Sequence, residues 1–328
     1  VPARTGYVNQ GWSSKKNSEK ATAKAKCTVN KNITLYAVQK KAVQLTFHRC
    51  DGSTWQKTTL AKGSSYSLPG VRDAEGYTFM GWSTKPMQSV SPQYEAEEKI
   101  TVNGNVDLYA VVFNRTTETD LTEDQLPQVD IYKYKQVIFV GDSRTEFMEN
   151  VLTGMGESAT KNVKFVCSAG KGLDWFTTTG WAQLYSIVQH DSNSILSKKT
   201  AVIFNFGVND LSKSADYAEY YNWIAPQLKS KGCELYFMSV NPVNRLMLPN
   251  AGRADRSEAA VRSFNQYMKA NLSSAYTYID MYSYLKSTGY SFASDHYGTG
   301  TVDDGLHYTT RTYKRIFAKC MDSLRVPA

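Results

Sequence analysis

Residues 136–144 carry the sequence QVIFVGDSR, an apolar run of strand length that ends in a Gly-Asp-Ser turn. Consecutive apolar residues from Val137 to Val140 are typical of a strand that is buried on both faces of a parallel sheet. A serine after such a strand can expose its hydroxyl above the sheet, although Gly-Asp-Ser is more often a turn with an N-cap serine. The segment therefore predicts a strand-to-helix turn and makes Ser143 a candidate for catalysis.

Apolar runs alternate with helical stretches throughout the rest of the chain from residue 131. We expect five strands, at 136–140, 163–166, 201–206, 234–240 and 276–279. We expect helices at 146–152, 175–188, 218–229, 258–272 and 310–324. Strands that are apolar on both faces and alternate with helices predict a parallel sheet with helices on each side. In such folds the site lies at the carboxyl ends of the strands.

Two further polar clusters are candidates for this site. The sequence FGVND at 206–210 places Asn209 after the third strand, where its amide could face an oxyanion, although a turn is the simpler interpretation. The sequence DDGLHYT at 303–309 places Asp304 three residues before His307, so the carboxylate can hold the imidazole in one tautomer. The other histidines have no partner that is as evident: His48, His190 and His296.

The ordered set of three clusters resembles the SGNH hydrolase family, also called GDSL esterases. The resemblance covers residues 135–324 and implies a flavodoxin-like three-layer α/β/α sandwich with a five-stranded parallel sheet. It also implies that the protein uses no metal or organic cofactor. The roles that it implies are a nucleophile, Ser143, a base, His307, an orienting acid, Asp304, and an oxyanion hole made of Ser143, Gly172 and Asn209.

The chain departs from the family pattern at two places. Arg144 stands where a leucine usually follows the serine, which could matter for the charge of the substrate. The asparagine that often opens the second block is absent, and Cys167 or Ser168 stands in its region. The oxyanion glycine is therefore Gly172 or Gly170, and we favour Gly172 because it stands closer to the Asp-Trp that resembles the family's continuation.

An internal repeat occupies the first third of the chain. GYVNQGWS at 6–13 recurs as GYTFMGWS at 76–83, and TVNKNITLYAV at 28–38 recurs as TVNGNVDLYAV at 101–111. This pattern resembles the Listeria-Bacteroides repeat, also called the internalin-type B repeat. The resemblance implies small β-rich surface modules of a bacterial envelope or secreted protein, and we expect the chain to start inside a repeat array.

The repeat and a shift in composition divide the chain into four expected parts. They are a partial repeat at 1–41, a full repeat at 42–113, a linker at 114–130 and the hydrolase domain at 131–328. The linker is rich in Thr, Glu and Asp and has no apolar period. We therefore expect a hydrolase part that folds and acts without the repeats.

Composition excludes several classes of protein. The 328 residues are 41% hydrophobic, which suffices for a sizeable core, and no apolar run approaches the about 20 residues of a membrane helix. Five scattered cysteines without ligand spacing argue against a zinc site and a disulfide framework. Nine basic residues and one acidic residue fall within 1–41, a pattern that favours a solvated face over a nucleic-acid patch.

The sequence as a whole predicts a secreted or cell-surface bacterial serine esterase. We expect it to hydrolyse carboxylic esters, with short acyl groups such as acetyl on a glycan as the substrate. The partner would be a small or polymeric ester, such as a cell-wall or dietary polysaccharide, and no nucleic acid. The alternatives are a glycan O-acyltransferase of the same fold and a non-catalytic surface adhesin.

Overall fold

A computed structural model describes residues 1–23, 30–191, 198–248, 256–293 and 304–324. The chain forms two compact units. The first comprises Val1–Pro69, Gly81–Gln88 and Pro92–Val111, and the second comprises Gly70–Met80, Ser89–Ser91 and Val112–Ala328. Within the described ranges, no helix has both the length and the hydrophobicity of a membrane span.

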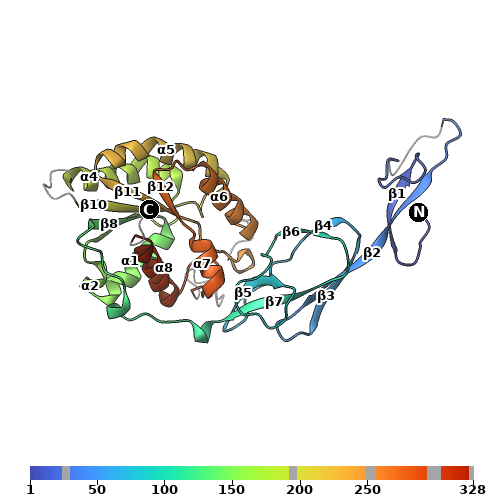
Figure 1. The fold of residues 1–328 in the computed structure, drawn as a ribbon, viewed down its shortest axis with the longest axis horizontal. Coiled ribbons are helices and arrows are strands. Elements are labelled where there is room, and N and C mark those ends of the chain that lie inside the picture. The colour runs from blue at the N-terminus through green and yellow to red at the C-terminus, as the bar shows by residue number, and fades with distance from the viewer. Residues whose placement is uncertain (24–29, 192–197, 249–255, 294–303, 325–328) are drawn as a thin grey trace. The chain divides into compact units, whose positions relative to one another are not determined.

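The second unit is built on a five-stranded parallel sheet in the order β12-β11-β10-β8-β9 (Figure 1). The strands are β8 (Tyr134–Gly141), β9 (Val163–Cys167), β10 (Lys199–Asn205), β11 (Cys233–Met238) and β12 (Tyr276–Ile279). Numbered from β8, this order is 2-1-3-4-5, which is that of flavodoxin-like folds. The predicted fold class is confirmed.

Helices cover both faces of this sheet. They are α1 (Ser143–Met155), α2 (Glu157–Thr160), α3 (Leu173–Trp175), α4 (Trp181–Asp191), α5 (Ser214–Ser230), α6 (Glu258–Asn271), α7 (Met281–Thr288) and α8 (Thr310–Ser323). Short turns of other helix types are η1 (Arg115–Thr117), η2 (Glu123–Gln125), η3 (Phe176–Gly180), η4 (Leu211–Lys213) and η5 (Arg245–Met247). Figure 1 shows α4, α5 and α6 on one side of the sheet and α1 and α8 on the other.

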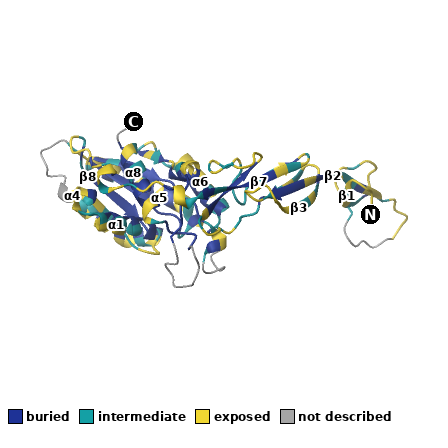
Figure 2. Cartoon of the chain, turned by 90° about the horizontal axis from the view of Figure 1, so that it is seen from below, coloured by how far each residue is buried: buried dark blue, intermediate teal, exposed yellow. Residues whose placement is uncertain are grey.

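The apolar runs that predicted the strands fill both interfaces of the sheet. Ile138 and Val140 belong to the buried cluster that α4, α5 and α6 complete. Phe139 points to the other face, where its ring lies 5.8 Å from that of Phe317 in α8. Figure 2 shows the strands of this sheet as buried and the outer faces of helices such as α5 as exposed. The sequence analysis missed the short helices α2 and α7, and the helix expected at 175–188 is interrupted by the wider turn η3.

The repeats contribute short β-strands, as expected. One sheet has the order β1-β2-β7-β5 with β3 paired to β2, and β4 pairs with β6. The strands are β1 (Tyr7–Ser13), β2 (Tyr36–His48), β3 (Thr54–Ala61), β4 (Ser64–Ser67), β5 (Tyr77–Ser83), β6 (Lys99–Val102) and β7 (Val106–Asn114). Trp82 is fully buried against Phe47, at 4.8 Å between ring centroids, and its indole N–H donates to Pro69 O. The tryptophan of the repeat signature is thus a core anchor.

Residues 114–130 differ from the linker that their composition predicts. The Glu118 carboxylate is buried and accepts hydrogen bonds from Ser291 Oγ at 2.6 Å, from Arg315 Nη1 at 3.1 Å and from Thr312 Oγ1. Leu126 is also buried. The pattern looked like a solvated linker because it has few apolar residues, whereas its polar side chains bind buried polar partners in the second unit.

Part of the second repeat copy also belongs to the second unit. Asp73 accepts hydrogen bonds from Asn244 Nδ2 at 2.8 Å and from Arg115 Nη2 at 2.8 Å. Lys286 Nζ donates to Met80 O at 2.8 Å. These contacts argue against a hydrolase part that folds independently from residue 131, so we expect the segments before residue 131 to stabilise it.

Replacing Glu118 by alanine in the full chain should destabilise the second unit by about 3–5 kcal/mol, because it leaves the buried Arg315 guanidinium without its carboxylate. The matched control is Asp124→Ala in the same segment, since Asp124 is exposed and should contribute within about 0.5 kcal/mol. Thermal inactivation of ester hydrolysis measures the difference. Equal inactivation temperatures for the two variants would show that residues 114–130 behave as a passive linker.

Candidate active site

Ser143 is the first residue of α1 and directly follows the turn at the end of β8. Asp142 caps the helix, since its carboxylate accepts the Arg144 backbone N–H at 3.0 Å. Gly141 has to be a glycine because a Cβ there would lie 2.0 Å from Thr145 Oγ1 and 3.0 Å from Asn205 O. The tight strand-to-helix turn thus places the Ser143 hydroxyl at the carboxyl edge of the sheet.

The structure brings Ser143, His307 and Asp304 together in one chain of hydrogen bonds. His307 Nε2 lies 2.8 Å from Ser143 Oγ, and His307 Nδ1 lies 2.6 Å from Asp304 Oδ2. The second carboxylate oxygen, Asp304 Oδ1, accepts the backbone N–H groups of Leu306 at 2.8 Å and His307 at 2.7 Å. Asp304 is 0% and His307 2% exposed, so both polar side chains are buried and paired.

Gly305 allows the tight turn between the acid and the imidazole. Its φ is +67°, in the left-handed region, and a Cβ would lie only 2.4 Å from Asn244 O. The Asn244 N–H in turn donates to Gly305 O at 2.8 Å. The loop that carries His307 is therefore in close contact with the loop that follows β11.

The loops after β8, β9 and β10 meet at the same edge. Ser168 N–H donates to Gly141 O at 3.3 Å, and Asn209 Nδ2 donates to Lys171 O at 2.7 Å. Asn209 Oδ1 accepts a hydrogen bond from the guanidinium of Arg256, which is 4% exposed. Because a guanidinium can only donate, Arg256 fixes the amide with its Nδ2 toward the Lys171 loop.

The two candidate glycines differ in conformation and surroundings. Gly170 has a φ of +70° and is exposed, and a Cβ there would meet nothing within 4 Å. Gly172 has an extended backbone, and a Cβ would lie 2.3 Å from Asp210 Oδ2. The same Asp210 oxygen accepts the Leu173 N–H at 2.9 Å, which fixes the carboxylate in the space that a side chain at position 172 would need. Residue 172 must therefore be a glycine.

Two carboxyls lie behind the site, the buried Asp142 and the half-buried Asp210. Burial raises the pKa of Asp142 to about 6, although the Arg144 guanidinium opposes this shift. Burial also raises the pKa of Asp210, which is opposed by its hydrogen bonds from Leu173 N–H and the Tyr217 hydroxyl. The pKa of the N-cap carboxyl next to Ser143 is therefore higher than that of an exposed aspartate. Among the described residues, no group of three His, Cys, Asp or Glu side chains is arranged to hold a metal ion.

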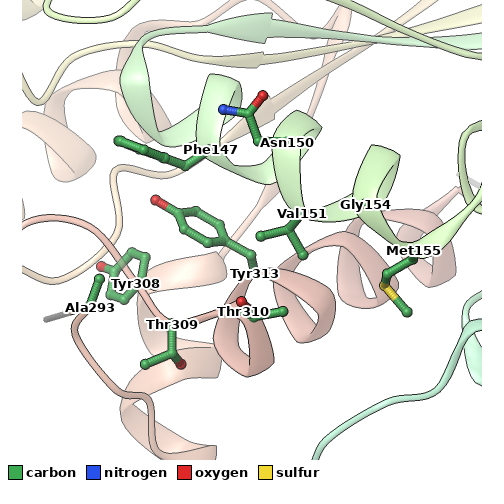
Figure 3. Close-up of a pocket in the computed structure, with 10 residues that line it drawn as sticks. All are labelled: Phe147, Asn150, Val151, Gly154, Met155, Ala293, Tyr308, Thr309, Thr310 and Tyr313. Carbon is green, nitrogen blue, oxygen red and sulfur yellow. The ribbon is translucent and has the colours of Figure 1, made fainter. Parts of the chain in front are cut away.

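A groove of about 610 Å³ is lined by Phe147 and by Tyr308, the residue after His307 (Figure 3). The Phe147 ring lies edge to face with the His307 ring at 4.5 Å and also lines the groove. Side chains of α1 and of the start of α8 line the groove, and they are both apolar and polar, among them Asn150, Val151 and Thr310. It offers space for a ligand of drug or sugar size next to the histidine.

Sequence reasoning missed two residues of this site. Phe147 and Arg256 carry no local motif, because their roles depend on contacts across the fold. Arg144, the departure that could matter for the charge of the substrate, is 2% exposed and donates to backbone carbonyls. His48 bonds Asp107 in the repeat at 2.8 Å, whereas His296 lies outside the described residues.

Family models match both parts of the chain. The model of the GDSL-like lipase/acylhydrolases matches residues 137–320, and that of the Listeria-Bacteroides repeat domain matches residues 1–38 and 44–111. No curated protein matches the chain significantly.

The solved structures that the chain resembles are only distantly similar to it in sequence. A proposed acylhydrolase from Bacteroides fragilis is 15% identical over 62% of this chain and 92% of its own, with a TM-score of 0.41. The C-terminal catalytic domain of a Streptococcus pneumoniae peptidoglycan O-acetyltransferase is 16% identical over 59% of this chain and 94% of its own, with a TM-score of 0.37. An acetylxylan esterase from Geobacillus stearothermophilus is 10% identical over 60% of this chain and 96% of its own, with a TM-score of 0.36.

The acylhydrolase model covers more than half of the chain, and the fold that carries Ser143 and His307 agrees with it. The chain therefore belongs to the GDSL-like lipase/acylhydrolase family and is an ester-hydrolysing enzyme of the SGNH type, with Listeria-Bacteroides repeats before its hydrolase part.

Proposed function

We propose that Ser143, His307 and Asp304 form the catalytic triad of this esterase. The observation that carries the proposal is the buried hydrogen-bond chain, with 2.8 Å between Ser143 Oγ and His307 Nε2 and 2.6 Å between His307 Nδ1 and Asp304 Oδ2. With the Nδ1 proton donated to Asp304, Nε2 is free to accept the serine proton. The carboxylate then stabilises the imidazolium that forms.

The reaction that follows has two steps. Ser143 Oγ loses its proton to His307 Nε2 and attacks the ester carbonyl, and His307 returns this proton to the departing alcohol oxygen. Water then attacks the acyl-enzyme in the same way, with Nε2 as the base, and releases the acid. In a glycan O-acyltransferase a sugar hydroxyl would replace this water.

We propose that the oxyanion is bound by Ser143, Gly172 and Asn209. The backbone N–H groups of Ser143 and Gly172 donate no hydrogen bond to any residue that the structure describes. The Asn209 amide has a second N–H besides the one that Lys171 O accepts. Gly172 is favoured over Gly170 because it lies against Asp210, next to Asn209, whereas Gly170 is exposed. Fixed donors of this kind stabilise the transition state without reorganisation.

We propose that the substrate is a short-chain ester, such as an acetyl ester, of a glycan. His307 must protonate the departing alcohol oxygen, so the alcohol half of the ester lies on the histidine side of Ser143. The groove that Phe147 lines is near the histidine, since the Phe147 ring lies 4.5 Å from the His307 ring, and its mixture of aromatic, aliphatic and polar side chains suits a sugar. The Listeria-Bacteroides repeats support action outside the cell or at the bacterial surface.

Replacing Ser143 by alanine should remove nearly all ester hydrolysis and leave the melting temperature close to that of the wild type. Triads contribute about 10⁴- to 10⁶-fold to kcat, so less than about 1% of the rate should remain. The measurement is acetate release from a small acetate ester and from acetylated glycans, with and without an added glycan acceptor. A folded variant that keeps a tenth of the rate would refute the proposed nucleophile, and an excess of transfer over hydrolysis would indicate an acyltransferase.

A large side chain in the groove should weaken the binding of glycan esters and leave the hydrolysis of small esters unchanged. Asn150→Trp should raise KM for an acetylated oligosaccharide roughly tenfold, or ~1.4 kcal/mol, because the indole occupies the space of the sugar. Ethyl acetate should be hydrolysed at the wild-type rate because its alcohol is too small to reach the groove. Thr153→Trp is the control, since Thr153 is exposed on the same helix but does not line the groove. If both variants had the same KM for the acetylated oligosaccharide, the groove would not bind the alcohol half of the ester.

A further inference from the structure

Arg144 follows Ser143 directly and has a buried side chain. The guanidinium donates three hydrogen bonds, all to backbone carbonyls: Nε to Leu306 O at 3.0 Å, Nη1 to Asn241 O at 3.0 Å and Nη2 to Pro242 O at 2.9 Å. With 2% of its surface exposed, it is not available to a substrate. The guanidinium therefore has a structural role inside the protein.

The three acceptors belong to the two loops that border the site. Leu306 precedes His307, and Asn241 and Pro242 lie in the loop after β11. Tyr308, on the other side of His307, reinforces this link, since its hydroxyl donates to Pro242 O at 2.5 Å and its ring lies 5.3 Å from the guanidinium. Arg144 thus joins the start of α1 to the residues on both sides of His307.

The energetics favour a structural role for each of these hydrogen bonds. A buried guanidinium is costly unless its donors are paired, and buried carbonyls are equally costly without donors. A leucine, the usual residue after the serine, would leave all three carbonyls without this donor. A lysine has one nitrogen and cannot reproduce the planar fork that reaches three acceptors.

We propose that Arg144 is a positioning residue that holds His307 at hydrogen-bond distance from Ser143. Ser143 and His307 are 164 positions apart, so their 2.8 Å contact depends on how the His307 loop sits on α1. Arg144 is next to the nucleophile in the sequence, and its side chain donates directly to this loop, at Leu306 O. This inference rests on the proposed triad and adds to it a residue that does not touch the substrate.

The test compares Arg144→Leu and Arg144→Lys with the wild type, using kcat and KM for a small acetate ester and the melting temperature. Misplacing a catalytic group by about 1 Å costs on the order of 100-fold, so Arg144→Leu should lower kcat by about that factor and leave KM within about threefold. Arg144→Lys keeps the charge and part of the hydrogen bonding and should lose about tenfold. It also serves as the test if the leucine variant does not fold.

Arg315→Leu is the matched control. Arg315 is buried to a similar degree, but it donates to Glu118, Thr288 and Gly289 instead of the His307 loop. It should lower the melting temperature and, below that temperature, keep kcat within about threefold. The inference is overturned if a folded Arg144 variant keeps full kcat, or if Arg315→Leu lowers kcat as much as Arg144→Leu. If Ser143→Ala also keeps its activity, the proposed triad itself fails.

Discussion

The hydrogen bond between His307 Nε2 and Ser143 Oγ joins two parts of the chain that are 164 residues apart. It requires that the turn after β8 and the loop before α8 meet at one edge of the sheet. The parallel order of the sheet provides this meeting point, because the carboxyl ends of β8, β10 and β11 lie side by side. Packing of α8 against the sheet, as between Phe317 and Phe139, holds the far end of that loop. The buried core and the chemistry of the site therefore depend on the same arrangement.

The site is built from buried polar groups, each of which has to be paired. Asp304 uses one oxygen for the backbone of its own loop and the other for His307, so the carboxylate both shapes the loop and orients the imidazole. Arg144 and Arg256 likewise hold a loop and an amide in place. In a low dielectric such networks are rigid when complete and costly when broken. Rigidity of this kind is what a preorganised site needs.

Much of this arrangement could be predicted from the sequence, and the reasons are physical. Runs such as 137–140 are apolar on both faces only because the sheet is covered on both sides, and Asp304 and His307 lie three residues apart in one local turn. The contacts of Glu118 and Arg144 could not be predicted, since their partners lie far away in the chain. A polar segment such as 114–130 has the same composition whether its side chains form hydrogen bonds to water or to buried polar groups. Composition therefore does not distinguish a linker from a packed segment.

Covalent labelling with a fluorophosphonate, followed by peptide mapping, tests most directly whether the serine in this hydrogen-bond chain is activated. The reagent reacts with a serine whose proton is accepted by an adjacent base. The account predicts one adduct, on the peptide that contains Ser143, and its loss in a folded His307→Ala variant. An adduct on another residue, or labelling of Ser143 that does not depend on His307, would contradict it.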